Sequence, residues 1–296
     1  MYESVFTANF VERWGDAFAE FYRYKKEGKF YIVPSLSGKK TYSYVPGLTY
    51  TDRNAHACFD LLSFVEGKSY TIRTIDPDKK EFAESEPVTM RLDISSGEKE
   101  PIMKNFNATA RNQVRQAERA GLRTAIGNEK KLLDDFYKLY TMTMYRHGTP
   151  PFSRALLDTL VKYIELEVIV TYVADEPASG MIMTNDSAIT WNPYGGSNPK
   201  FSKLFANQLM YRDAIYHAIE RGQKIFDFGR SPYTKHGGTY LFKQRMGARP
   251  VGLCDYRPQS EDIYSKYSTA AAVWKRLPKP VADFVGPKLR RYLADA

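Results

Sequence analysis

Residues 226–250, FDFGRSPYTKHGGTYLFKQRMGARP, combine basic side chains with a glycine-rich turn in a pattern that could stabilise negative charge. A short apolar strand is expected to end at Gly229 and to expose Arg230 and Ser231. After a double glycine, the next expected helix carries Lys243 in its second turn. Helix N-termini and nearby cations suit a phosphate or a developing oxyanion. A surface loop followed by a solvated basic helix is the alternative interpretation.

A second group of basic residues lies in residues 108–123, ATARNQVRQAERAGLR. Arg111 and Arg115 are four residues apart, so they share one face of the expected helix. Guanidinium groups bind phosphates through paired hydrogen bonds, which makes this face a candidate for anion contacts. The alternative is a solvated helix face that Glu118 partly balances.

The chain lacks the sequence motifs of several other kinds of enzyme and binding site. The 4 histidines are scattered without the spacing of metal ligands, so no metal site is predicted. The chain has no GxSxG, GxGxxG or GxxxxGK motif, which argues against a serine hydrolase and against the common nucleotide-binding loops. The residues therefore predict no tightly bound cofactor.

Composition limits the partners and the compartment. The chain has 296 residues, of which 43% are hydrophobic and 26% charged, as in globular proteins. Its formal net charge of +9 favours polyanionic partners such as nucleic acid, nucleotide sugars, coenzyme A or an anionic membrane surface. With 2 cysteines, no signal peptide and no membrane-spanning run, we expect a soluble cytoplasmic protein that could contact the inner face of the membrane.

The hydrophobic periodicity predicts a mixed α/β chain in two halves, with a break near residues 121–128. Helices are expected at residues 8–26, 53–66, 102–120, 129–146, 153–165, 202–221 and 238–246. Strands are expected at residues 30–34, 41–46, 69–75, 87–94, 166–174, 179–186, 187–196, 224–228 and 249–256.

The C-terminal tail is basic and amphipathic. Apolar residues such as Trp274 and Phe284 are expected on one side, and basic residues such as Lys288 and Arg290 on the other. Such a segment can lie on an anionic membrane, or it can pack its apolar side against the protein.

The segment FDFGRS…GTYLFKQRMGARP resembles the signature of FemAB-like proteins, the non-ribosomal peptidyltransferases of the Fem group. That family usually has (F/Y)DFGRS followed by GTYxFKxxWG, and Met246 stands here in place of the tryptophan. The likeness covers most of residues 88–293 and includes ARNQVRQAERAGL, FYKLYTMTMYRHGTPPFS and WNPYGGSNPKFSKLFANQLMYRDAIYHAIERG. The ending WKRLPKPVADFVGPKLRRYLA resembles FemAB-like proteins linked to exopolysaccharide and PEP-CTERM gene neighbourhoods.

The resemblance implies two lobes with the acyl-CoA N-acyltransferase (GNAT) fold. We expect an N-terminal lobe at residues 1–123, a C-terminal lobe at residues 124–260, and a tail at residues 261–296 that packs on the N-terminal lobe. Well-known family members move an amino acid from aminoacyl-tRNA to an amine of a peptidoglycan precursor. The lysine of the family's FK pair falls on Lys243 and is expected to stabilise the transition state.

The hypothesis is therefore an N-acyltransferase that takes its donor, aminoacyl-tRNA or acyl-CoA, as a co-substrate. The acceptor is expected to be a phosphorylated sugar or peptide precursor of the cell envelope. A non-catalytic membrane-binding module on a transferase fold is a further alternative. Asp227 is a candidate proton acceptor, although it could instead pair with an arginine or cap a turn. The expected substrate-binding residues are Arg230, Ser231, Phe242, Tyr240, Asn207, Tyr194, Arg111 and Arg115.

Overall fold

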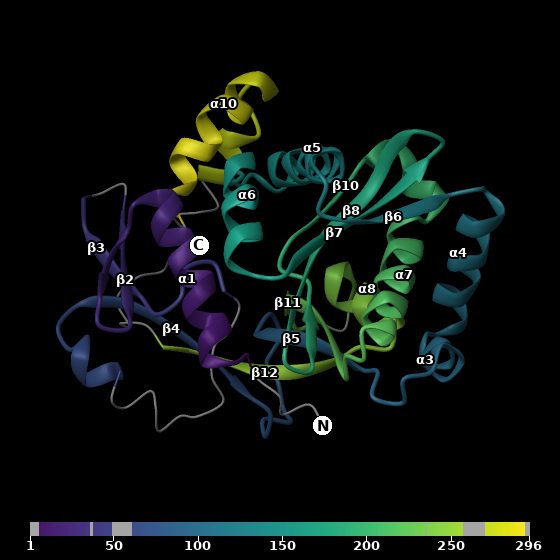
Figure 1. The fold of residues 1–296 in the computed structure, drawn as a ribbon, viewed down its shortest axis with the longest axis horizontal. Coiled ribbons are helices and arrows are strands. Elements are labelled where there is room, and N and C mark those ends of the chain that lie inside the picture. The colour runs from purple at the N-terminus through teal and green to yellow at the C-terminus, as the bar shows by residue number, and fades with distance from the viewer. Residues whose placement is uncertain (1–5, 36–37, 49–60, 235, 257–269, 294–296) are drawn as a thin grey trace.

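The computed structural model describes residues 6–35, 38–48, 61–234, 236–256 and 270–293 (Figure 1). Its helices are α1 (Ala8–Tyr22), α3 (Lys99–Asn105), α4 (Ala108–Arg119), α5 (Lys130–His147), α6 (Arg154–Tyr163), the 3₁₀ helix η1 (Pro199–Leu204), α7 (Ala206–Glu220), α8 (Gly238–Arg245) and α10 (Lys279–Arg290). Its strands are β1 (Lys25–Glu27), β2 (Phe30–Pro34), β3 (Lys40–Ser43), β4 (Ser69–Asp76), β5 (Pro87–Asp93), β6 (Arg123–Gly127), β7 (Leu166–Val173), β8 (Glu176–Asp186), β9 (Ile189–Trp191), β10 (Gly195–Ser197), β11 (Ile225–Pro232) and β12 (Arg249–Tyr256).

One mixed sheet of 12 strands runs through the molecule in the order β1-β2-β3-β4-β12-β5-β11-β9-β8-β7-β6, with β10 beside β8. Late strands pair with early ones: β11 pairs with β5, and β12 lies between β4 and β5. The mixed α/β class is therefore confirmed. The lobe boundary at residues 123 and 124 stays a prediction, and strand pairing crosses it.

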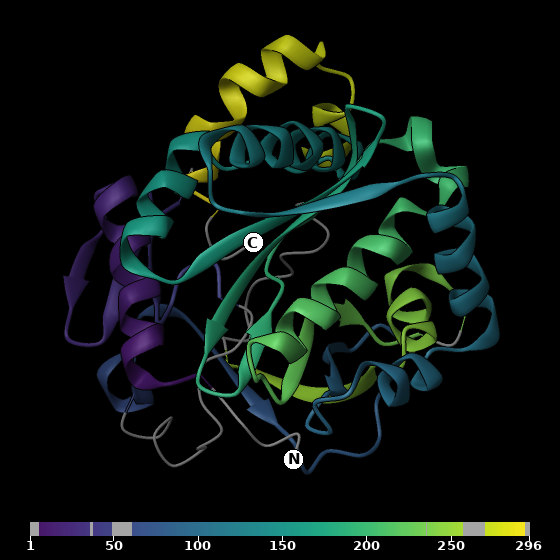
Figure 2. The same ribbon diagram turned by 45° about the vertical axis from the view of Figure 1, so that its right-hand side comes forward.

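Helices cover both faces of the sheet (Figure 2). Strand residues alternate between the faces, as Ile182 in β8 and its neighbour Met183 do. Ile182 packs in the cluster that holds α1, α5 and α6, whereas Met183 packs with α3, α7 and α8. Two hydrophobic cores thus lie back to back across the sheet.

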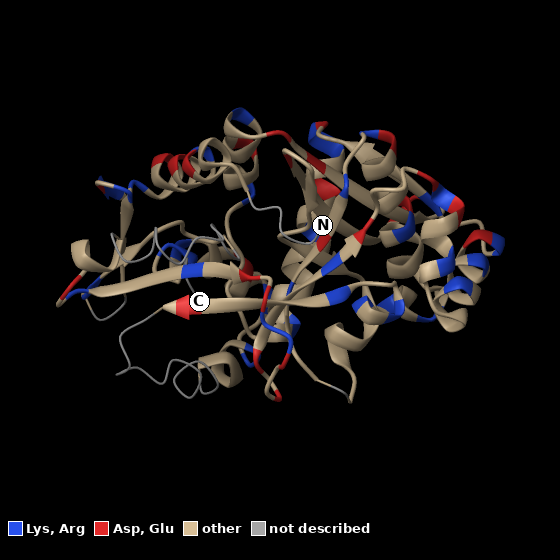
Figure 3. Ribbon diagram, turned by 90° about the horizontal axis from the view of Figure 1, so that it is seen from below, with Lys and Arg blue, Asp and Glu red and all other residues tan. Residues whose placement is uncertain are grey.

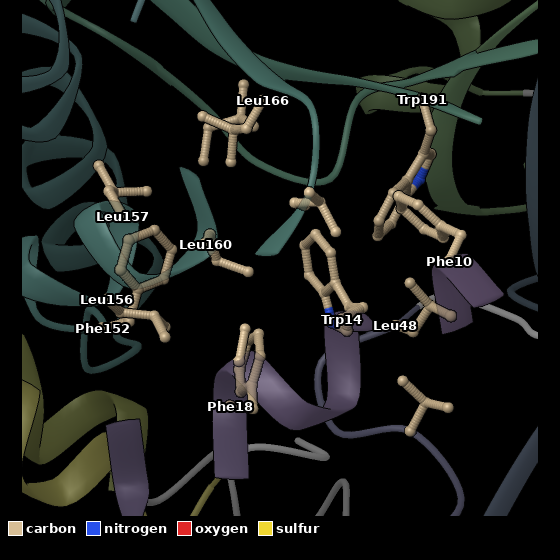
Figure 4. Packing of buried hydrophobic residues seen from close by; sticks show 14 of the residues in the cluster. Phe10, Trp14, Phe18, Leu48, Phe152, Leu156, Leu157, Leu160, Leu166 and Trp191 are labelled. Carbon is tan, nitrogen blue, oxygen red and sulfur yellow. The ribbon is translucent and has the colours of Figure 1, made fainter. Parts of the chain in front are cut away.

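The first core joins the N-terminal helix to the second half of the chain (Figure 4). Phe10, Trp14 and Phe18 recur every four residues and put one apolar face of α1 inward. Trp14 packs against Trp191 with ring centroids 5.1 Å apart, and its indole nitrogen donates a hydrogen bond to the carbonyl of Pro46 at 3.0 Å. Burial on this scale ties the two halves together.

Most predicted elements are present, and the differences occur where the chain changes direction. The predicted helix at 8–26 ends at Tyr22, because Arg23 is left-handed with φ 56° and β1 follows. The predicted helix at 102–120 is two helices, since Asn107 caps α4 through its side chain. The predicted strand at 187–196 is split into β9 and β10, and the predicted helix at 202–221 is η1 followed by α7. Of the predicted helix at 53–66, residues 53–60 lie outside the described residues and 61–64 are helical.

The tail packs back through α10, which contacts α5 in the second half of the chain (Figure 1). Its packing on an N-terminal lobe stays a prediction. Trp274 is buried, and the hydroxyl of Tyr145 in α5 donates a hydrogen bond to the carbonyl of Leu277 at 2.7 Å. The predicted apolar and basic sides of the tail are wrong at two residues, because Phe284 is 69% exposed and Arg290 is only 7% exposed. Among the described residues, no helix has the length and apolarity to cross a bilayer.

Candidate active site

The site begins where two parallel strands separate. Strands β9 and β11 pair in parallel over three residues, ending at Trp191 and Asp227. The backbone N–H of Asn192 still donates to the carbonyl of Asp227 at 2.9 Å. The chain then turns away and returns as β10 along β8, whereas β11 continues along β5 as far as Pro232. Beyond Asp227, β11 thus has β5 on one side and no paired strand among the described residues on the other.

A β-bulge lies at this point of separation. The register between β11 and β5 shifts between Asp227 and Arg230, and Gly229 has φ 73°. A β-carbon on Gly229 would come within 2.7 Å of the carbonyl oxygen of Asn192. Only glycine meets both requirements without strain. The expected end of the strand at Gly229 is therefore a bulge, and the strand resumes after it.

Lys243 lies against this bulge. It is 7% exposed, and its ammonium donates hydrogen bonds to the carbonyls of Gly229 and Arg230, each at 3.0 Å. Burial lowers the pKa of Lys243 to about 8, while the negative charge of Asp227 acts in the opposite direction. The group is thus a mostly charged donor at neutral pH in a site of low polarity.

Asp227 holds the bulge through a buried network. Its carboxylate accepts hydrogen bonds from the hydroxyl of Thr89 at 2.6 Å, the Nε of Arg91 at 2.9 Å and the backbone N–H of Gly229 at 2.8 Å. Asp227 and Arg91 are both fully buried. Arg91 is absent from the sequence-based predictions, although an arginine within the apolar strand PVTMRLD was a signal that could have identified it.

Two further polar groups at the site have no hydrogen-bond partner among the described residues: the hydroxyl of Ser231 and the indole N–H of Trp191. Both side chains are buried, so the expected exposure of Ser231 is wrong. The Trp191 nitrogen would lie 3.7 Å from a β-carbon on Gly229. Buried polar groups normally have partners, so the Ser231 hydroxyl is a candidate for contact with a substrate, whereas the Trp191 ring packs in the first core against Trp14.

A cavity of about 300 Å³ lies on the other side of α8. Phe242 lines it and packs against Tyr211, with ring centroids 5.3 Å apart. Lys243 is not among its lining residues, whereas Gln113 and Gln208 are. Side chains of α4 and α7 thus contribute polar groups to the cavity beside α8.

The other predicted substrate-binding residues do not all lie at the same site as Lys243. Tyr240 is buried against Tyr233, with ring centroids 5.1 Å apart. Asn207 is half-buried near the start of α7, next to a cavity-lining residue. Tyr194 packs with Tyr140 and Phe152 in the core on the opposite face of the sheet, so the structure does not bring it together with Lys243.

The basic face of α4 is only partly available to ligands. Arg111 is half-buried, and its guanidinium donates to the carbonyls of Phe106 and Lys104, which end α3. Arg115 is exposed. Figure 3 shows basic and acidic segments side by side at the end of the molecule that carries α3 and α4. Arg111 therefore stabilises the helix junction, and Arg115 extends into solvent.

The described residues contain no group of three or more His, Cys, Asp or Glu side chains that could hold a metal ion. The groups at the site that could act on a substrate are a buried ammonium, the bulged strand beside it and the Ser231 hydroxyl, which has no hydrogen-bond partner among the described residues.

Residues 104–244 match the model of the acetyltransferase (GNAT) domain, which covers β11 and nearly all of α8. No curated protein sequence matches the chain.

Three solved structures are similar over nearly the whole chain. FemX is 15% identical with a TM-score of 0.56, and the match covers 90% of this chain and 94% of FemX. The C-terminal domain of a protein named as a lysylphosphatidylglycerol synthetase, from Agrobacterium fabrum, is 13% identical with a TM-score of 0.54 and coverages of 90% and 96%. L-PGS from Bacillus licheniformis is 11% identical with a TM-score of 0.52 and coverages of 94% and 100%. These similarities show the fold that the chain shares with them.

Proposed function

We propose that this chain transfers an aminoacyl group from aminoacyl-tRNA to an amine of a cell-wall or polysaccharide precursor. The chain is an acyltransferase with a GNAT domain and a Fem-like fold. One observation carries the proposal. The buried ammonium of Lys243 lies on a strand bulge at the point where two parallel strands separate, and the strand edge there is unpaired among the described residues.

In the proposed reaction, the neutral acceptor amine attacks the ester carbonyl of the donor. The C–N bond forms, the carbonyl oxygen gains negative charge, and the C–O bond to the tRNA ribose then breaks. The ribose hydroxyl leaves with the proton that the amine gives up. Lys243 stabilises the charged oxygen, an effect that is worth roughly 3–4 kcal/mol for one well-placed donor. Arg230, whose backbone carbonyl accepts a hydrogen bond from Lys243, is proposed to bring a second positive charge to the site.

Asp227 acts in this scheme by positioning other groups. Its carboxylate already accepts hydrogen bonds from Thr89, Arg91 and Gly229, and it is fully buried. Its oxygens are engaged by these protein donors, and it has no exposed surface from which to reach a substrate amine. We therefore assign proton removal to the substrates, and we assign to Asp227 the shape of the bulge that holds Lys243.

Charge and fold support aminoacyl-tRNA as the donor. A net charge of +9 favours a polyanion. One of the similar structures carries a name that refers to a lysylated phospholipid, which contains an aminoacyl ester. A second candidate is acyl-CoA-dependent acylation of an amino sugar or peptide, which the match to the acetyltransferase domain favours.

The two donors are separated by one assay. The protein is incubated with candidate amine acceptors and either radiolabelled aminoacyl-tRNA or acyl-CoA. Label that moves to the acceptor from tRNA, and not from the thioester, supports the proposal. Thioester consumption without tRNA would replace it with the second candidate. No turnover with either donor would favour a non-catalytic module.

We also propose that α10 contacts an anionic membrane surface. Its inner face consists of Ala282, Gly286 and Arg290, and its outer face of Val281, Phe284 and Lys288. Of the four exposed large hydrophobic side chains among the described residues, Val273, Val281 and Phe284 belong to the tail. Apolar and basic groups on one outer face suit an anionic bilayer.

Vesicle sedimentation tests this contact. We expect binding to vesicles that contain phosphatidylglycerol and little binding to phosphatidylcholine alone. Phe284→Ser should weaken binding about fivefold or more, because it removes buried apolar area at the interface. Phe64→Ser is the matched control, since Phe64 is also exposed but lies outside the tail. Equal loss in both variants would contradict a specific role for α10.

A further inference from the structure

The inner face of α10 buries an arginine. Ala282, Gly286 and Arg290 are spaced by four residues, and all three are buried. Gly286 lets the helix approach closely, since a β-carbon there would lie 2.6 Å from the ring of Pro151. Arg290 is held inside the protein and is only 7% exposed.

The described residues supply no counter-charge for this guanidinium. The Nη1 of Arg290 has no hydrogen-bond partner there, and no described carboxylate pairs with it. Arginine keeps its proton at any physiological pH. Burial of an uncompensated ion costs several kcal/mol, so a position like this favours the binding of an anion.

The surroundings of Arg290 are rich in hydroxyl donors. The titratable groups within electrostatic range of it are the phenols of Tyr140, Tyr194, Tyr22 and Tyr24. Tyr22 and Tyr24 stack with centroids 5.4 Å apart, and Tyr140 and Tyr194 are in edge contact at 5.9 Å. These rings come from both halves of the chain, so the tail closes a cluster that neither half forms alone.

Two of these hydroxyl groups can donate a hydrogen bond to a ligand. The hydroxyl of Tyr22 is buried without a partner among the described residues. The hydroxyl of Tyr140 accepts a hydrogen bond from the backbone N–H of Phe152 at 3.4 Å, which leaves its own proton to donate. Burial raises the pKa of both phenols, so both stay protonated and remain donors.

We propose that Arg290, Tyr22 and Tyr140 form a binding site for a phosphoryl group. The three donors come from α10, α1 and α5, and both phenols lie within electrostatic range of the guanidinium. A tetrahedral phosphoryl group can accept from several directions, whereas a planar carboxylate pairs mainly within the plane of one guanidinium. The site lies on the opposite face of the sheet from Lys243 and does not depend on the proposed transfer reaction.

The experiment measures ligand-dependent thermal unfolding of the full chain, because a ligand that binds the folded state raises its stability. Inorganic phosphate is compared with acetate and chloride at equal ionic strength. Uridine diphosphate and soluble dihexanoyl phosphatidylglycerol then distinguish a nucleotide source of the phosphoryl group from a lipid headgroup. We expect phosphate to raise Tm and acetate to do so weakly.

Three variants test whether phosphate binds at this cluster. Arg290→Met should weaken phosphate binding about tenfold or more, and Tyr22→Phe, which keeps the ring, about threefold or more. Arg291→Met is the matched control, because Arg291 is the adjacent but exposed arginine, and it should bind as the parent does. If Arg290→Met does not fold, Tyr22→Phe decides the outcome. The same phosphate response in Tyr22→Phe as in the parent, no response in the parent, or an equal response to acetate would overturn the proposal.

Discussion

At the scale of single residues, the site depends on how a lysine is kept charged inside a protein. Two carbonyl groups of the bulge accept hydrogen bonds from the Lys243 ammonium, and Asp227 adds a negative charge nearby. These contacts offset part of the loss of hydration, and burial still lowers the pKa of Lys243 to about 8. Such a group can strengthen its interaction with an oxygen that becomes negative during a reaction.

The lowered pKa of Lys243 predicts a pH-dependent stability. The folded-state pKa is about 8 and the ordinary value is 10.5, so between these values the unfolded chain holds a proton that the folded chain lacks. Stability relative to Lys243→Met is therefore expected to rise from pH 8 to pH 10.5, by on the order of 3 kcal/mol, and to be lost as the pH falls through 8. Urea unfolding of both proteins across this range measures it. A constant difference between them would contradict a buried, titrating lysine.

The Arg91–Asp227 pair gives a second prediction. Both groups are fully buried, so Arg91→Met leaves a carboxylate without its counter-charge. We expect that variant to lose about 3–5 kcal/mol of unfolding free energy. Adding Asp227→Asn should recover part of the loss, because the second change removes the isolated charge. A double variant that is less stable than Arg91→Met by the full effect of Asp227→Asn would show that the two residues are not coupled.

The sequence identified some of these residues and missed others for physical reasons. Lys243 was predicted because the FK pair of the FemAB-like signature falls on Phe242 and Lys243. Asp227 was noted as a possible partner of an arginine. That arginine, Arg91, lies 136 residues away in sequence, and only the pairing of β11 with β5 brings them together. Tyr194 was predicted for the same groove, but it lies in the turn between β9 and β10 and packs against the core on the other face of the sheet.

At the scale of elements, the bulge in β11 and the divergence of β9 create the site. Gly229→Ala is expected to destabilise the protein by about 1–3 kcal/mol, because a β-carbon meets the Asn192 carbonyl at a left-handed φ. The same change should lower activity, since it displaces the carbonyls that hold Lys243. Gly222→Ala is the matched control, with φ 75° and no atom within 4 Å. Thermal unfolding of both variants measures the difference, and equal losses would mean that φ strain alone acts at Gly229.

Element types were largely predictable, and element ends were less so. The apolar spacing of α1, α5 and α6 identified these helices, and Ser153 caps α6 through its side chain. The breaks at Asn107, Pro193 and Phe205 depend on local capping and on tertiary contacts, such as the hydrogen bond from the Asn107 N–H to the carbonyl of Arg245. The extension of β11 past Gly229 required β5 as a partner, which periodicity within one segment cannot reveal.

At the scale of the whole molecule, one sheet connects both halves of the chain. Because β11 and β12 pair with β5 and β4, we expect the chain to unfold in one cooperative transition. Calorimetry measures this through the ratio of calorimetric to van't Hoff enthalpy, which should be close to one. Two separate transitions would support independent lobes at the predicted boundary.

Single-turnover kinetics of Lys243→Ala, with the donor that the transfer assay identifies, test most directly whether Lys243 stabilises the transition state. Lys224→Ala serves as the control, since Lys224 is an exposed lysine just before β11. We predict that Lys243→Ala folds and binds donor as the parent does, while the rate of transfer falls about 10²-fold or more. A folded Lys243→Ala protein that transfers within a factor of two of the parent rate would contradict the account.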